Sequence, residues 1–126
     1  MLNAAENALS LSDEVLQRLA DEVLAAWHHA HGTTSGTAYA LVGSCGLAIV
    51  LDGVLSRGEM ALAAEPAGQN LLDRYIRGLL NEVSTQQAER IHTLLERDIR
   101  AAGVTVDGVA GWVLLFFKLA PAGESQ

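Results

Sequence analysis

The chain has 126 residues, half of them hydrophobic, a formal net charge of −7 at pH 7 and one cysteine. This length predicts a single domain around one hydrophobic core. The acidic balance and the single lysine, Lys118, argue against nucleic acid and anionic lipid as partners, because both are bound largely through basic surface. No uncharged apolar run approaches the roughly 18 to 20 residues of a membrane span, so we expect a soluble protein without direct membrane insertion.

The beginning of the chain and Cys45 bear on location. The first residues carry acids and lack the basic and apolar regions of a secretory signal, and one cysteine cannot form an internal disulfide. We therefore expect a cytoplasmic protein, with an N-terminal tail over 1–11, one domain over 12–120 and a C-terminal tail over 121–126.

A first helix is predicted from its caps and its apolar spacing. Ser12 precedes two acids that suit the positive end of a helix dipole, and apolar residues follow at helical spacing as far as Trp27. Gly32 stands where a left-handed cap residue is expected. The pattern predicts an amphipathic helix of about 18 residues.

Residues 37–53 change to the two-residue period of strands, with a turn from Gly43 to Gly46, and predict a hairpin. Its second run is apolar on both faces, so we expect a central strand. Ser56 and Glu59 then have the spacing of a capping box, which begins a short helix at Arg57. Pro66 disfavours helix in the residue before it and marks the end of that helix.

A long helical region is predicted from Gln69 to about Ala102, closed by Gly103. The apolar stripe is interrupted near Ser84, where the capping-box spacing recurs, so we expect a kink or a restart there. A second hairpin follows, and its last strand, Trp112 to Leu119, is apolar on both faces.

Together these elements predict an α+β fold in the order helix, β-hairpin, short helix, long kinked helix, β-hairpin, with an antiparallel sheet covered by helices on one face. The uncovered face of such a sheet favours a homodimer. The candidate interface residues lie on the last strand: Trp112, Leu114, Phe116 and Phe117.

The stretch "HHAHGTTSGT" at residues 28–37 raises the question of a metal site. On a helix, His28 and His31 lie about 60° apart and His29 points about 160° away from His31, so the three cannot bind one ion together. We favour a capping and boundary role, and keep as the alternative a metal site of His28 and His31 completed by His92 or a carboxylate.

Other polar residues offer no assembled catalytic set. The loop "GTTSGT" leaves a helix and enters a strand, the reverse of a phosphate-binding loop, and is interpreted as a mobile connection. Cys45 lies in a turn with no base beside it, and Asp52 is interpreted as a turn residue at a strand end. No cofactor is predicted.

Arg74 and Arg77 share a helix face and are candidates for binding a small anion or a partner's carboxylate. The acid-first spacing of Asp73 to Arg77 and of Glu96 to Arg100 favours instead a solvated face with ion pairs along the helix.

The run "LAIVLDGVLSRGEMALA", residues 47–63, resembles the core signature of the MpsC-like family. In that family an apolar strand ends in a glycine, a leucine and a hydroxyl residue follow, and a glutamate comes three places later. The matching positions are Leu51, Gly53, Leu55, Ser56 and Glu59, and the similarity in element order spans roughly residues 12 to 119. Residues 31–36 depart from it, because the family has a Gly-Arg-Gly-Pro-like segment there.

The resemblance implies a small soluble companion of a Na⁺-translocating, membrane-potential-generating system linked to inorganic carbon uptake, in which other subunits perform the transport. It implies no catalytic residues. A membrane transport subunit is therefore the protein partner that the resemblance suggests.

Two hypotheses for function follow. The favoured one is a non-catalytic cytoplasmic interaction or regulatory protein, dimeric, that docks through strand Trp112 to Leu119 or the face around Arg74 and Arg77. The rival is a small ligand-binding or metal-binding sensor, or an enzyme, with a cleft near the first hairpin. It requires His31, Asp52 and His92 to converge.

Overall fold

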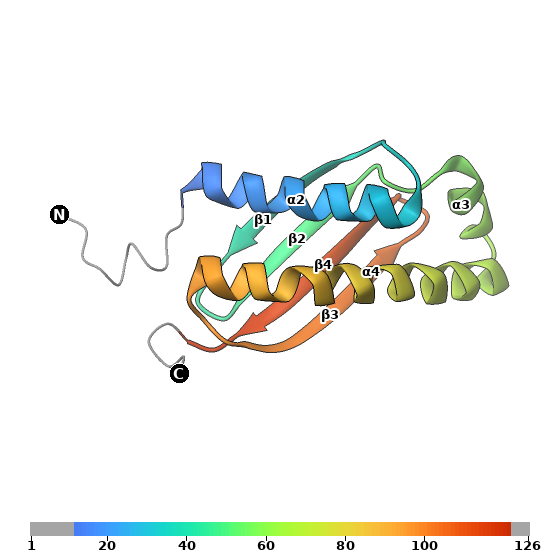
Figure 1. Cartoon of the computed structure of the whole chain (residues 1–126). Helices are drawn as coiled ribbons and strands as arrows, with labels where there is room; N and C mark the ends of the chain where they lie inside the picture. Colours follow the sequence, from blue (N-terminus) through green and yellow to red (C-terminus); the bar gives the residue numbers. More distant parts are fainter. Residues whose placement is uncertain (1–11, 122–126) are drawn as a thin grey trace.

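The computed structural model describes residues 12–121, which form an α+β fold with one four-stranded antiparallel sheet. The predicted tails lie outside this range except for residue 121. Figure 1 shows the two long helices lying side by side across one face of the sheet. The elements, in chain order, are α2 (Asp13–His31), β1 (Thr37–Val42), β2 (Gly46–Asp52), α3 (Arg57–Leu62), α4 (Pro66–Leu95), β3 (Ile99–Asp107) and β4 (Trp112–Leu119). No helix in residues 12–121 is long and apolar enough to cross a bilayer.

Helix α2 has the boundaries that its sequence predicts. The Ser12 hydroxyl accepts a hydrogen bond from the backbone N–H of Val15 at the start. At the end Gly32 adopts φ 90°, a left-handed conformation that glycine takes without steric cost, and its N–H donates to the carbonyl of His28. Trp27 is fully buried against the sheet side of the helix.

The sheet has the strand order β1-β2-β4-β3, so the two strands that are apolar on both faces are central, as predicted for β2. The core lies between this sheet and helices α2 and α4. Its fully buried large side chains are Trp27, Phe117, Leu19, Leu47, Ile49, Leu51, Leu72, Ile76, Leu80, Ile91, Leu115 and Val23.

Helix α3 begins at Arg57 with both hydrogen bonds of the predicted capping box, from the N–H of Glu59 to the Ser56 hydroxyl and from the N–H of Ser56 to the Glu59 carboxylate. It ends at Leu62, and α4 starts at Pro66, whose missing N–H costs nothing at the first turn of a helix.

Of the kink or restart predicted near Ser84, the restart was wrong, since α4 runs unbroken for 30 residues and is drawn as one continuous coiled ribbon in Figure 1. The hydroxyls of Ser84 and Thr85 donate to the carbonyl of Asn81 inside the helix instead of capping a new one. The predicted end near residue 102 was also wrong. Glu96, at φ 53°, ends the helix, and residues from Ile99 onward pair with β4.

Strand β4 alternates between the two faces of the sheet. Val113, Leu115, Phe117 and Leu119 are buried under the helices. Phe117 is 1% exposed, so its prediction as an interface residue was wrong: the two-residue period places it on the opposite face from Phe116. Trp112, Leu114 and Phe116 lie on the face without helices.

One buried charge joins the chain's C-terminal end to the first hairpin. Arg97 is 2% exposed, and its guanidinium donates to the carbonyls of Ala120 at 2.7 Å, Gly43 at 3.0 Å and Ser44. The planar fork of arginine lets one side chain satisfy three carbonyls at once.

We expect Arg97→Met to lower the free energy of unfolding by about 2 to 4 kcal/mol, because three carbonyl groups lose their donor while the apolar stem is kept. Urea unfolding followed by circular dichroism measures the loss at fixed protein concentration. Arg74→Met, on the exposed side of α4, is the matched control and should change the same free energy by no more than about 0.5 kcal/mol. Equal effects of the two substitutions would contradict a structural role for Arg97.

Candidate functional site

The face of the sheet that carries no helix is apolar and partly exposed. Its side chains form rows across the strands because directly paired residues point to the same face. Three rows are Thr37, Asp52, Trp112 and Asp107; Tyr39, Val50, Leu114 and Thr105; and Leu41, Ala48, Phe116 and Gly103. A fourth row contains Gly46, Lys118 and Ala101. We call these rows together the open face.

Three large apolar side chains of the open face are strongly exposed: Leu41 at 61%, Tyr39 at 47% and Phe116 at 38%. They come from both an edge strand and a central strand, so the exposed apolar surface extends across the sheet. Scattered single apolar residues are normal on a protein surface, but a continuous apolar patch marks a binding surface.

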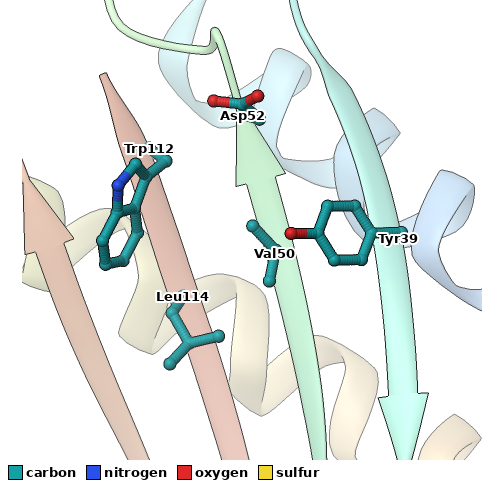
Figure 2. A pocket seen from close by; sticks show the side chains of 5 residues that line it. All are labelled: Tyr39, Val50, Asp52, Trp112 and Leu114. Atoms are coloured by element: carbon teal, nitrogen blue, oxygen red, sulfur yellow. The ribbon is translucent and has the colours of Figure 1, made fainter. Parts of the chain in front are cut away.

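A hollow of ≈ 280 Å³ lies within the open face. Figure 2 shows its five lining side chains, Tyr39, Val50, Asp52, Trp112 and Leu114, standing on β1, β2 and β4 with the helices behind the strands. The walls are mainly apolar, with one carboxylate at the rim and the Tyr39 hydroxyl directed towards Val50. The hollow is therefore suited to an apolar group.

A second polar arrangement, the His31 cluster, lies at the C-terminal end of α2 and consists of His31, Thr33 and Glu59. His31 Nε2 lies 2.7 Å from Glu59 Oε2, and His31 Nδ1 lies 2.8 Å from Thr33 Oγ1. A carboxylate only accepts hydrogen bonds, so Nε2 carries the proton. The imidazole also stacks on the Trp27 ring, with centroids 4.6 Å apart and planes at 16°.

Glu59 links the His31 cluster to the start of α3. One carboxylate oxygen accepts from His31 and the other from the backbone N–H of Ser56. Burial alone would raise the pKa of Glu59, but the Ser56 and His31 hydrogen bonds and the attraction of His31 outweigh it, so the pKa is lowered from its ordinary value of 4.5. The carboxylate is held charged at neutral pH.

The His31 cluster has the order hydroxyl, imidazole, carboxylate, which is also the order of a nucleophile and its base. The side chain of His31 is only 4% exposed, however, and it packs between Trp27 and Tyr75. Because the imidazole is buried, its hydrogen bond with Glu59 serves to link α2 to α3.

The structure does not bring the predicted metal ligands together. His28 Nε2 donates to the carbonyl of Ser35 at 2.8 Å, and His92 Nδ1 donates to the carbonyl of Arg97 at 2.9 Å. Across residues 12–121 no group of three or more His, Cys, Asp or Glu side chains has the geometry to hold a metal ion.

The three side chains that the rival hypothesis requires to converge also lie apart. His31 contacts Tyr75 near the start of α4, whereas His92 lies 17 positions further along the same helix, about 25 Å away at 1.5 Å per residue. Asp52 is an exposed residue at the rim of the hollow on the open face. The three side chains lie in separate parts of the fold.

Arg74 and Arg77, the predicted anion-binding pair, differ in their contacts. Arg77 donates to Asp73 Oδ2 at 2.7 Å and to the carbonyl of Val104 at 2.7 Å, so its guanidinium is used in tying α4 to β3. Arg74 is exposed on α4. Cys45 is exposed in the turn of the first hairpin.

The loop predicted as a mobile connection is tied to β2. The Ser35 hydroxyl donates to the carbonyl of Gly53 at 3.2 Å. Gly36 has φ 101°, and a Cβ there would lie 2.7 Å from the carbonyl oxygen of Asp52. Close backbone approach explains the glycine at this position.

A scan against protein-family models, a search of curated proteins and a search of solved structures each find no match to this chain. The likeness to the MpsC-like family therefore stays a prediction.

Replacing Glu59 with Gln should cost at least about 1 kcal/mol of folding free energy at pH 7, because the amide oxygen can keep only one of the two hydrogen bonds from His31 and Ser56, as a neutral bond, and the amide NH2 cannot accept the other. A lowered folded pKa means that the carboxylate contributes stability above 4.5, and that this contribution is lost as the pH falls through the folded pKa. Urea unfolding from about pH 6 to about pH 3.5 should thus show a smaller acid loss for Glu59→Gln than for the wild type.

Glu89→Gln, on the exposed side of α4, is the control for the pH experiment. It removes the same charge without touching the His31 cluster, so a smaller acid loss in Glu59→Gln than in Glu89→Gln reports the contacts of Glu59. If the two variants lose stability in parallel, the hydrogen bonds of Glu59 do not lower its pKa.

Proposed function

We propose that this chain is a non-catalytic interaction or regulatory protein that works in the cytoplasm as a homodimer, with the open face buried between the two copies. The observation that carries the proposal is the exposure of Leu41, Tyr39 and Phe116 together on one sheet face. Residues 12–121 bring together none of the polar sets that the enzyme or sensor hypothesis requires, which favours a binding role.

The size of the open face supports a second copy as its occupant. Four strands about 4.8 Å apart and six to nine residues long cover roughly 19 Å by 25 Å, or about 500 Å² on each copy before side-chain relief is counted. Two such faces together approach the lower limit of a specific protein–protein interface, about 1,200 Å². Burial of each large apolar side chain in the interface adds about 1.5 to 3 kcal/mol at most to the free energy of association.

The charge distribution supports the same occupant. The chain has a net charge of −7, but the rows of the open face hold only Asp52, Asp107 and Lys118 as charged residues. The remaining described charges lie on helices, loops and the β3 edge region, so two copies can meet at the open face with little of the repulsion that their net charge would cause elsewhere.

The resemblance to the MpsC-like family adds a physiological setting to the proposal. In that setting the homodimer is an accessory component of a membrane-potential-generating system linked to inorganic carbon transport, and a membrane transport subunit is a further protein partner. The helices, which face outward in such a dimer, are then the surface offered to that partner.

The experiment is the mass of the purified protein in solution, measured by light scattering. We expect twice the mass of one chain for the wild type and the mass of one folded chain for Phe116→Asp. A carboxylate at the centre of the open face would have to be buried in the dimer, which should weaken association by at least about a hundredfold. Circular dichroism confirms that the variant is folded.

Leu71→Asp is the matched control, because Leu71 is 59% exposed but lies on α4. This variant should keep the mass of the wild type. A wild-type protein that remains a monomer at all concentrations tested, or a Phe116→Asp variant that remains a dimer, would overturn the proposal.

A further inference from the structure

We infer that the two copies pair antiparallel across their open faces, so that the Phe116 ring of each lies over the hollow of the other and Lys118 of each lies over the acidic end row of the other. The inference rests on the proposed homodimer and adds its arrangement and the residues that specify it. It is carried by the positions of Phe116, the hollow and Lys118 within the four rows.

The rows of the open face make an antiparallel pairing self-complementary. On β4 they are marked in order by Trp112, Leu114, Phe116 and Lys118. Consider a two-fold axis between the two faces that runs across the strands, midway between the Leu114 and Phe116 rows. Rotation about this axis exchanges the first row with the fourth and the second row with the third. Each copy then supplies the same contacts to the other, as a symmetric dimer requires.

Phe116 and the hollow occupy positions that this axis exchanges. The Phe116 ring lies over Gly46, since a Cβ added at Gly46 would be 2.4 Å from the ring's Cζ. Gly46 is at one end of β2, and the hollow lies at the other end, beside Val50 and Asp52. The two-fold axis therefore brings the ring of one copy over the hollow of its partner.

The sizes also agree. The hollow has ≈ 280 Å³, and an apolar cavity of about 150 Å³ in a protein is enough to bind benzene. The absence of a side chain at Gly46 leaves room for the Phe116 ring beside that end of β2.

Lys118 meets complementary charge in the same arrangement. It stands in the fourth row, and the first row of the partner holds Asp52 and Asp107 on either side of Trp112. An ammonium group over an indole with a carboxylate beside it gains both a cation–π and an ion-pair interaction.

Sheet twist does not remove this charge contact. Two packed sheets cross at about 30°, which displaces residues about 10 Å from the axis sideways by roughly one strand spacing. Because an acid flanks Trp112 on both neighbouring strands, Lys118 still lies near a carboxylate after such a displacement.

The other symmetric arrangement is disfavoured by the same charges. A two-fold axis parallel to the strands would place Lys118 at the same end as the partner's Lys118, and Asp52 at the same end as the partner's Asp52. Like charges would then meet at both ends, and each Phe116 would lie at the end away from the partner's hollow.

The test uses two charge reversals in the full chain, Lys118→Glu and Asp52→Lys, with dimer dissociation constants measured by analytical ultracentrifugation at low salt. Each variant alone should dimerise about tenfold more weakly than the wild type, since two symmetric contacts become repulsive. An equimolar mixture of the two should form heterodimers about as strong as the wild type, because both contacts are then attractive. The double variant Lys118→Glu with Asp52→Lys should also recover a dimer dissociation constant close to that of the wild type.

Matched controls carry the same charge changes on exposed helical positions, Arg74→Glu and Glu82→Lys, and should leave the dissociation constant within about twofold of the wild type. Circular dichroism establishes that all variants are folded.

The outcomes separate this inference from the proposed function. A wild-type dimer whose affinity is unchanged by either single reversal overturns the antiparallel arrangement and leaves the homodimer standing. A mixture no stronger than the single variants also overturns it. A wild-type monomer removes the homodimer and the arrangement together.

Discussion

The strands β2 and β4 carry apolar side chains on both of their faces, and this constraint governs the rest of the structure. Central position in the sheet satisfies their backbone hydrogen bonds, and the helices α2 and α4 bury one face completely. In residues 12–121 no third long helix is present to cover the other. The chain therefore leaves apolar surface exposed on the open face, and this surface is the basis of the proposed homodimer.

The covered side of the sheet is held by contacts that depend on charge as much as on apolar burial. Glu59 completes the capping box of α3 and accepts from His31, which fixes α3 against the end of α2. At the opposite end of the fold Arg97 donates hydrogen bonds to the carbonyls of Gly43, Ser44 and Ala120. The first contact links α2 to α3, and the second links the turn of the first hairpin to the residue after β4, while strand pairing itself sets the rows of the open face.

Local signals explain which features the sequence predicts. The caps of α2, the capping box of α3 and the turns at Gly43 and Gly53 each depend on residues within four positions of one another, so the α+β class and most boundaries can be read directly. The same local signal misleads at Ser84. There the stabilising contact of the hydroxyl is the carbonyl of Asn81, and the unbroken packing of α4 decides the outcome.

Features that depend on distant residues could not be predicted in this way. The hydrogen bond between His31 and Glu59 joins positions 28 apart, and no residue spacing in the sequence indicates it. The apolar character of β4 on both faces also hides which alternate residues point outward, and this ambiguity is why Phe117 was grouped with Phe116. Knowing that Leu115 faces the helices would have separated them.

The edges of the sheet are less suited to association than its open face, which supports the proposed homodimer. Exposed edge strands invite pairing with another chain through their free backbone groups. Here each long helix supplies a side chain that donates a hydrogen bond to a carbonyl of an edge strand. Gln17 donates to the carbonyl of Ala38 on β1, and Arg77 donates to the carbonyl of Val104 on β3. With donors placed at both edges, continuation of the sheet into a second copy would displace these hydrogen bonds, whereas contact through the open face displaces none of them. In the proposed homodimer α2, which carries four acids and one arginine, also faces outward, and its charge opposes further association.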